Sequence, residues 1–212
     1  MRIEVWADFH CPYCFIGKAR LFEALGQLGL VEAAEVIPRS FLLNKDSDKP
    51  DGLSIAEHVK MEYGKQIDEV LKGFKALEEI AKGDGLMLDM VNARYANMMD
   101  AHRLLQYAKT QGVGNEFFRR AQEMEFMQGV ILSDHEVLVR AANDVGLHER
   151  DARAVLSSGQ FRQEVLADDA IARQMNIDYV PYYLVDGTQH FSGDLSQKDY
   201  LDALVKAAHR SI

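Results

Sequence analysis

A pair of cysteines three residues apart, at the junction between a predicted strand and a predicted helix, constrains the fold of this chain more than any other feature. Residues 2–7 carry the β-forming side chains of a strand, and residues 11–14 read Cys-Pro-Tyr-Cys after a short turn. Pro12 suits the first position of a helix, and apolar residues then recur at helical spacing until Gly29. The pattern predicts a helix whose beginning holds both thiols, which indicates redox chemistry.

The start of that helix favours a reactive thiolate at its first cysteine. Unpaired N–H groups and the positive end of the helix dipole stabilise a negative charge on Cys11. A thiolate there can attack a disulfide, and Cys14 then resolves the mixed disulfide that forms. We therefore expect the pair to cycle between a dithiol and a disulfide, with no metal and no separate cofactor.

Three other interpretations of the cysteine pair remain open at this point. A structural disulfide across so short a loop restricts the unfolded chain little, because the stabilisation grows with loop length. A zinc site needs about four nitrogen or sulfur ligands, and His10 or a more distant histidine would have to complete the set. The third interpretation is an inert pair of buried thiols.

Composition excludes several classes of function. The 212 residues include 48% hydrophobic and 27% charged side chains, as in a globular protein that buries a core. The 24 Lys plus Arg stand against 33 Asp plus Glu, and the formal net charge of −9 disfavours nucleic acid and anionic lipid as partners. The N-terminus carries charges at positions 2, 4 and 8, unlike a secretory signal, and no apolar stretch is long enough to span a membrane. We therefore predict a cytoplasmic protein without nucleic-acid or membrane partners.

Beyond the cysteine helix the pattern becomes helical and then returns to strands. Residues 35–43 predict a second strand, which Pro38 marks as edge-like or bulged at that point. A polar connector at 44–52 precedes about a hundred residues of helical periodicity, where Ser54 and Glu57 form a capping box. Later helices are predicted at 97–111, 115–128, 134–145 (capped by Ser133), 149–157 and 160–175. The last predicted elements are strands at 182–185 and 189–191, joined at Asp186-Gly187, and a terminal helix that starts at Ser196.

A proline at the head of the first hairpin strand is the second notable feature. Pro181 cannot donate to a sheet ladder, so it is either an ordinary trans proline at an edge or part of a cis peptide bond. If this loop lies beside Cys11, the backbone of Val180 is free to pair with an extended substrate segment, as in strand addition.

Four motifs occur in a fixed order along the chain. Residues 8–18 read Asp-Phe-His-Cys-Pro-Tyr-Cys-Phe-Ile-Gly-Lys, and residues 100–105 read Asp-Ala-His-Arg-Leu-Leu. They are followed by Leu-Ser-Asp at 132–134 and Val-Pro-Tyr-Tyr at 180–183. With this set the chain resembles the DsbA-like branch of the thioredoxin superfamily over essentially its whole length. Within that branch it looks most like the FrnE-type proteins, whose opening motif is Asp-x-x-Cys-Pro-Trp/Tyr-Cys-x-Ile-Gly-Lys.

The resemblance implies a fold of the α/β class. A thioredoxin fold would be split by a large all-helical domain inserted between its β-α-β and β-β-α halves. The thioredoxin-like domain would then span residues 1–48 and 158–212, and the inserted helical domain would span residues 49–157.

The resemblance also implies roles for individual residues. Cys11 would be the nucleophile, Cys14 the resolving thiol, and the peptide bond before Pro181 would be cis. Asn97 and His102 would face the cysteines from the inserted domain, although such residues on an amphipathic helix are more often packing or surface groups. The candidate substrate-binding residues are Val180, Pro181, His10, Pro12, Tyr13, Asn97 and His102.

The chain departs from the family pattern in three respects. Met98 stands where the relatives carry a threonine, which removes a polar group from the run before His102. The relatives' Ser-Gly-Ala-Gln before the last helix appears here as Ser-Gly-Asp-Leu at 192–195, which alters one wall of the expected site. Some relatives have a second cysteine pair, which this chain lacks.

Three functions follow from these features. The leading hypothesis is a DsbA-type thiol–disulfide oxidoreductase or isomerase acting on disulfide-containing polypeptides or small thiols, with glutathione as a candidate reductant. The alternative is a glutathione-dependent transferase or isomerase of the kappa-class or hydroxychromene-carboxylate isomerase type. Such relatives carry serine at the position of Cys11, but Asp194 near a helix N-terminus could engage the amino-acid end of glutathione. A third hypothesis is a chaperone or partner-binding module that does not use the thiols.

Overall fold

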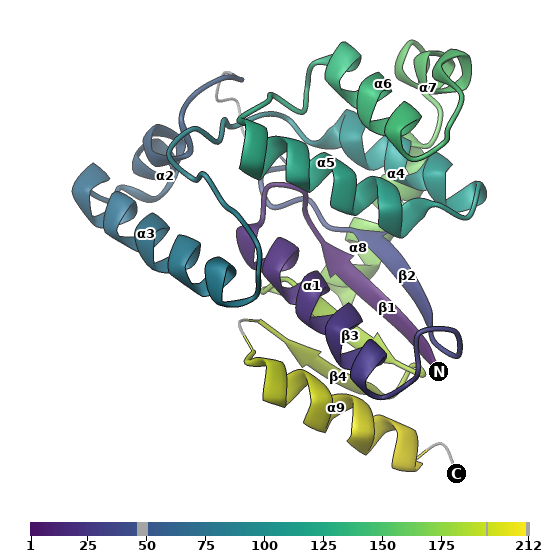
Figure 1. The fold of residues 1–212 in the computed structure, drawn as a ribbon. Helices are drawn as coiled ribbons and strands as arrows, with labels where there is room; N and C mark the ends of the chain where they lie inside the picture. Colours follow the sequence, from purple (N-terminus) through teal and green to yellow (C-terminus); the bar gives the residue numbers. More distant parts are fainter. Residues whose placement is uncertain (46–50, 194, 211–212) are drawn as a thin grey trace.

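A four-stranded mixed sheet forms the centre of the molecule (Figure 1). The computed structural model describes residues 1–45, 51–193 and 195–210. The strands are β1 (Arg2–Ala7), β2 (Glu35–Ser40), β3 (Tyr182–Val185) and β4 (Gln189–Ser192). Their order across the sheet is β2-β1-β3-β4, with β1 parallel to β2 and antiparallel to β3, and β3 antiparallel to β4. The predicted β-α-β opening and closing hairpin are confirmed.

Strand β2 lies at the edge of the sheet, as its proline predicts. Pro38 is paired with Val5 of β1. Because β2 has a strand on one side only, the missing N–H of Pro38 deprives no second strand of a hydrogen-bond donor. The strand ends at Ser40, three residues earlier than predicted. Beyond it, the N–H groups of Leu42 and Leu43 donate to the carboxylates of Asp169 and Asp8 instead of a strand, at 3.1 and 2.8 Å.

The helices fall into two groups along the chain. Those next to the strands in sequence are α1 (Pro12–Gln27), α8 (Arg162–Gln174) and α9 (Gln197–Arg210). Those of the insertion are α2 (Ile55–Tyr63), α3 (Ile67–Gly83), α4 (Met99–Thr110), α5 (Gly114–Gln128), α6 (His135–Asp144) and α7 (Glu149–Leu156).

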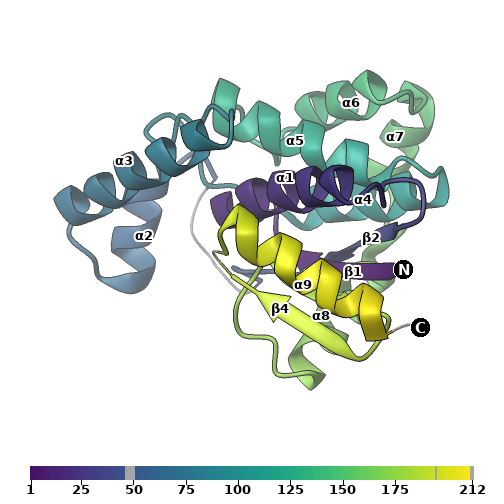
Figure 2. The same ribbon diagram turned by 60° about the horizontal axis from the view of Figure 1, so that its bottom comes forward.

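Different helices cover the two faces of the sheet (Figure 2). On one face, the Tyr200 hydroxyl of α9 donates to the hydroxyl of Tyr183 in β3 at 2.9 Å, and α9 packs along α1. On the other face, the indole N–H of Trp6 in β1 donates to the Asp168 carbonyl of α8 at 3.1 Å. Side chains alternate across the pleat, so each strand supplies both layers.

The ends of the inserted helices follow local signals, with one exception. Ser54 and Glu57 form the predicted capping box of α2, and Gly64 ends that helix with a φ of 67°. The prediction that Ser133 caps α6 is wrong. Asp134 is the N-cap residue, and its carboxylate accepts the N–H of Glu136 at 2.8 Å. A carboxylate also interacts favourably with the helix dipole, which explains why Asp134 takes this position.

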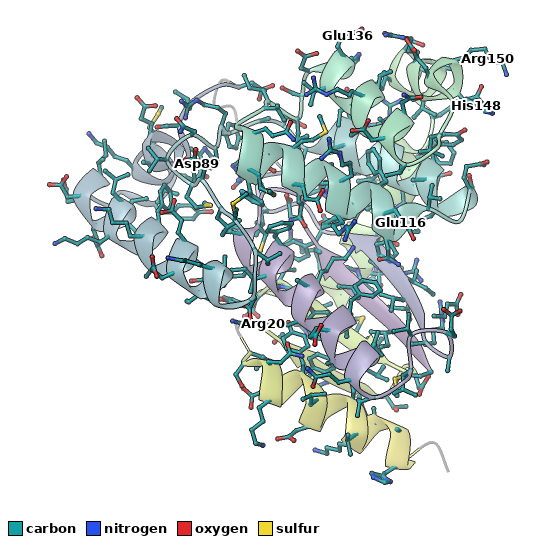
Figure 3. All side chains as sticks on the ribbon, in the orientation of Figure 1. Arg20, Asp89, Glu116, Glu136, His148 and Arg150 are labelled. Carbon is teal, nitrogen blue, oxygen red and sulfur yellow. The ribbon has the colours of Figure 1, made fainter. Side chains whose placement is uncertain are left out.

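The strands and the inserted helices share a hydrophobic core. The ring of Phe9, just after β1, stacks on Phe118 of α5 with centroids 4.3 Å apart. Arg20 of α1, labelled in Figure 3, forms an ion pair at 2.8 Å with Asp84, the C-cap residue of α3. The domain boundary predicted at residues 48–49 lies outside the described residues, and the domain division stays a prediction. Among the residues that the structure describes, no helix combines the length and apolar character needed to cross a membrane.

Candidate active site

The two thiols meet at the first turn of α1. Cys11 is the N-cap residue, with extended backbone angles, and Pro12 takes the first helical position. The sulfur of Cys11 accepts the backbone N–H of Cys14 at 3.1 Å. This hydrogen bond places the Cys11 sulfur at the positive end of the helix dipole, where a thiolate is stabilised. Both thiols are free, Cys11 being 5% exposed and Cys14 fully enclosed.

The environment of the second thiol opposes its ionisation. Burial raises the pKa of Cys14 well above its ordinary value, and the hydrogen bond and charge of Cys11 raise it further. The negative charge of Asp8 acts in the same direction. Cys14 therefore stays protonated until a base removes its proton, whereas Cys11 lies nearer the surface and at the helix terminus.

The Val180–Pro181 loop lies directly against the first cysteine. The peptide bond is cis, as the resemblance implies, and the Cys11 sulfur lies 3.7 Å from the carbonyl oxygen of Val180. The carbonyl of Pro181 accepts the N–H of Gly193 at 2.9 Å, which ties the loop to the hairpin. Residues 169 positions apart in sequence are thus brought into contact.

Polar side chains hold the loop that leads into Cys11. The carboxylate of Asp8 accepts the backbone N–H groups of His10 and Leu43, each at 2.8 Å. Gln122 of α5 is buried, and its side-chain amide lies 3.1 Å from the carbonyl oxygen of Phe9 and 3.3 Å from that of Cys11. Helix α5 therefore orients the backbone on which the nucleophile is placed.

His10 is paired with an acid from the inserted domain. Its Nδ1 lies 2.5 Å from a carboxylate oxygen of Glu125, and both side chains are buried. Burial opposes a charged imidazole, but the Glu125 carboxylate outweighs it and raises the pKa of His10. Burial likewise raises the pKa of Glu125, and His10 offsets part of that effect. The pair therefore holds a proton next to Cys11.

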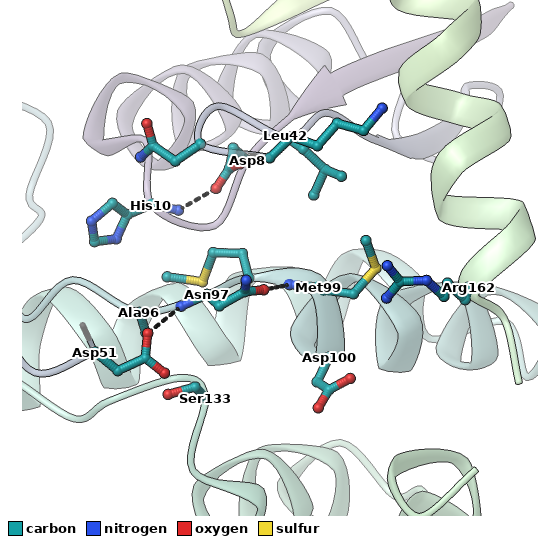
Figure 4. A pocket seen from close by; sticks show the side chains of 13 residues that line it. Asp8, His10, Leu42, Asp51, Ala96, Asn97, Met99, Asp100, Ser133 and Arg162 are labelled. Carbon is teal, nitrogen blue, oxygen red and sulfur yellow. Dashed lines mark hydrogen bonds between the residues drawn. The ribbon is translucent and has the colours of Figure 1, made fainter. Parts of the chain in front are cut away.

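A polar pocket of about 350 Å³ opens beside this loop (Figure 4). The loop from Asp8 to His10 forms one wall, and the segment around Asn97 at the start of α4 forms the other. The backbone N–H of Asn97 donates to Asp51 at 2.8 Å, and its side-chain oxygen accepts the N–H of Met99 at 2.9 Å. Asn97 thus shares a pocket with His10, and substrate contact by either residue stays a prediction.

The remaining candidates lie at different depths. Pro12 and Tyr13 are half-buried between the two cysteines. His102 is fully enclosed, edge-on to Phe9, with its Nε2 3.8 Å from the Asp8 carboxylate. His102 and the backbone N–H groups lower the pKa of Asp8, although burial alone would raise it. Substrate contact by His102 stays a prediction, and Asp194 lies outside the described residues.

Sequence reasoning assigned no role to Lys18, one helical turn beyond Cys14. The lysine is 5% exposed, its ammonium donates to Asn115 at 3.1 Å, and it lies 4.4 Å from the ring centre of Phe118. Burial lowers the pKa of Lys18 to about 7. The signal was present in the spacing, because Cys14, Lys18 and Leu21 lie on the same buried face of one helix. Glu125 and Gln122 gave no comparable signal, because their distance from the cysteines in sequence is large.

The comparisons with known proteins agree with this geometry. The family description "DSBA-like thioredoxin domain" matches residues 2–205. The crystal structure of a probable DsbA oxidoreductase from Streptomyces coelicolor is 30% identical, covers 99% of this chain and 90% of its own, and superposes with a TM-score of 0.92.

Two more distant structures share the fold. Cytosolic disulfide reductase DsbM from Pseudomonas aeruginosa is 17% identical over the whole of both chains, with a TM-score of 0.65, and has also been solved with glutathione. A 2-hydroxychromene-2-carboxylate isomerase is 15% identical, covers all of this chain and 96% of its own, and has a TM-score of 0.67. Within the described residues, no group of three or more histidine, cysteine or acidic side chains is arranged to hold a metal ion.

Proposed function

Because the chain belongs to the DSBA-like thioredoxin domain family, we propose that it is a thiol–disulfide oxidoreductase whose redox centre is the Cys11–Cys14 pair. The observation that carries this proposal is the position of the Cys11 sulfur. It accepts the backbone N–H of Cys14 in the first turn of α1 and lies 3.7 Å from the carbonyl oxygen of Val180. A nucleophilic thiolate is favoured by hydrogen-bond donors and by the positive end of a helix dipole, and the N-cap position of Cys11 offers both.

The reaction proceeds in two exchanges. The Cys11 thiolate attacks one sulfur of a substrate disulfide, and the other substrate sulfur leaves as a thiolate. The Cys14 thiolate then attacks the Cys11 sulfur, which releases the second substrate thiolate and leaves a Cys11–Cys14 disulfide. The substrate disulfide has gained two electrons and the enzyme dithiol has lost two. In the reverse direction the same pair donates a disulfide.

Disulfide-containing polypeptides are the substrates that the loop at Val180 favours. An extended segment placed along this loop can pair with its backbone, which holds the chain without selecting its side chains. Pro12 and Tyr13 would contact the segment at the cysteines, and His10 and Asn97 would contact it in the polar pocket. His102 would act indirectly by positioning Asp8. We further propose that the protein is of the FrnE type and works in the cytoplasm, the compartment named for DsbM.

The cysteine variants test this mechanism. Cys11→Ser should abolish reduction of a disulfide peptide, because no other sulfur occupies the N-cap position. Cys14→Ser should stop at the mixed disulfide, which mass spectrometry detects as a covalent adduct on Cys11. Full activity in both variants would contradict the mechanism.

A glutathione-dependent transferase or isomerase is the second candidate, favoured by the fold shared with a 2-hydroxychromene-2-carboxylate isomerase. In that case the reactive thiolate belongs to glutathione, and Cys11 lies next to it without acting as the nucleophile. Turnover that needs glutathione and survives Cys11→Ser would favour this function. Loss of turnover in Cys11→Ser, with glutathione serving only to reduce the disulfide, favours the oxidoreductase.

A further inference from the structure

The two exchanges at Cys11 require a group that accepts the thiol proton of Cys14. Cys14 must lose its thiol proton before it can attack, and its surroundings raise the pKa of that thiol. The neighbouring anion, Asp8, is a weak base because its pKa is lowered. His10 has its Nδ1 engaged by Glu125. Glu125 also raises the pKa of His10 against the opposing effect of burial, so the imidazole keeps its proton and, like Asp8, is a poor base for Cys14.

Lys18 follows Cys14 by one helical turn and lines a different cavity from Asp8 and His10. The two residues are four apart in α1, which places their side chains on one face of the helix with Cβ atoms about 5–6 Å apart. Cys14 and Lys18 interact electrostatically, and both are buried. Lysine carries its amine on a flexible four-carbon stem, and transfer of the Cys14 proton requires this amine to turn from Asn115 toward the sulfur.

The surroundings of Lys18 allow it to exist as a neutral amine. Burial lowers its pKa to about 7, while Cys14 and Glu116 oppose that shift and Arg119 adds to it. The partner of its ammonium is the neutral amide of Asn115, at 3.1 Å. The same amide donates to the carbonyl of Val36 at 2.6 Å, so the oxygen that faces Lys18 is fixed in place.

A path to solvent leads from this lysine. A cavity of about 560 Å³ between α1 and α5 reaches Lys18 from outside. Its charged lining residues are Lys18, Glu23, Glu116, Arg119 and Glu123, and Glu116 stands at the start of α5 (Figure 3). Water in such a cavity can take a proton from the ammonium, although Lys18 itself is 5% exposed.

We propose that Lys18 is the proton acceptor for the Cys14 thiol when Cys14 resolves the mixed disulfide on Cys11. The neutral amine takes the proton from the Cys14 sulfur and becomes an ammonium. The Cys14 thiolate then forms a bond to the Cys11 sulfur, and the bond from Cys11 to the substrate sulfur breaks. The substrate leaves as a thiolate with the electron pair of the broken bond, and the ammonium releases its proton to water in the cavity. This step rests on the proposed oxidoreductase function.

A chromogenic disulfide separates the two exchanges. When the reduced protein is mixed with 5,5′-dithiobis(2-nitrobenzoate), the first yellow thiolate is released by attack of Cys11 and the second by attack of Cys14. In the wild type we expect the rate of the second release to rise with pH through about 7, where Lys18 loses its proton. Lys18→Met should slow the second release ~100-fold at pH 7 and remove the inflection, with the first release unchanged.

Lys18→Arg is the matched control, because arginine keeps the positive charge but does not deprotonate. It should behave like Lys18→Met, since a fixed cation cannot accept a proton. A wild-type rate and inflection in Lys18→Arg would overturn the proposal, because charge alone would then suffice. Equal slowing of both releases in the two variants would also overturn it, since that result indicates a structural role.

Asn115→Ala tests the same step with Lys18 in place. Removing the amide oxygen takes away a partner of the ammonium, so the inflection of the second release should move to lower pH. An unmoved inflection would overturn the assignment to Lys18. Failure of the proposed function itself is distinguishable, because a wild-type protein that shows no second release has no resolving thiol.

Discussion

At the scale of single residues, the proton held between His10 and Glu125 is a property of this site that can be measured. Glu125→Gln leaves a hydrogen-bonding amide of nearly equal size but removes the charge that raises the pKa of His10. Burial is then the main remaining influence, so the pKa of His10 should fall below its ordinary value of 6.5. NMR titration of the His10 ring in the two proteins measures this shift. An unchanged His10 titration in Glu125→Gln would contradict the pairing.

The same pair makes stability depend on pH. The pKa of His10 is higher in the folded protein than the 6.5 of an unperturbed histidine. Its stabilisation is therefore fully present below about pH 6.5 and is lost as the pH rises through the raised pKa. The free energy of unfolding of the wild type should exceed that of Glu125→Gln by on the order of 1–3 kcal/mol at pH 6, and the difference should shrink in alkaline buffer. Urea titrations across this range measure it, and a difference that grows with pH would contradict the assignment.

At the scale of elements, the contact between α1 and the Pro181 loop depends on a glycine. A Cβ at Gly17 would lie 2.6 Å from the Tyr200 hydroxyl, 2.7 Å from the Tyr183 hydroxyl and 3.0 Å from the Cγ of Pro181. Gly17→Ala should therefore destabilise the protein by about 1–3 kcal/mol and push the loop away from Cys11, which slows disulfide exchange. Thermal unfolding and the disulfide assay report the two effects.

Gly26 provides the control in the same helix. A Cβ there meets no atom within 4 Å, so Gly26→Ala should stabilise the helix by roughly 0.5 kcal/mol through helix propensity alone. Exchange rates should be unchanged in this variant. If Gly17→Ala is as stable and as active as Gly26→Ala, the close approach of helix and loop is not required.

At the scale of the whole molecule, the inserted helices complete the core of the strand-bearing part. Phe9 packs on Phe117 and Phe118 of α5, with ring centroids 6.1 and 4.3 Å away, and Gln122 holds the backbone of the cysteine loop. Replacing residues 49–157 by a flexible linker would expose these apolar surfaces. We expect the shortened chain to lose its cooperative thermal transition, as monitored by circular dichroism. A cooperative transition at the wild-type temperature would instead show that the thioredoxin-like part folds by itself.

Much of the fold was predictable because its signals are local. The strand before the cysteines, the helix that opens at Pro12, the edge position of Pro38 and the capping box at Ser54 each depend on a few neighbouring residues. The cap prediction at Ser133 failed because the adjacent Asp134 supplies the capping carboxylate, and the predicted end of the second strand failed because distant groups competed with the local pattern. Strand β2 stops at Ser40 because carboxylates from other parts of the chain accept the next N–H groups.

Some features of the candidate site were predictable from the sequence, and others depend on the tertiary structure. The sequence alone determined the cysteine pair at a helix N-terminus, because spacing and position within one helix define that arrangement. The tertiary structure decided which residues surround the pair. It placed Val180 against Cys11 and Glu125 against His10. It also buried Lys18, one helical turn after Cys14. Burial and the pairing of charges arise only when distant segments pack together, and these two effects set the protonation of the groups on which disulfide exchange depends.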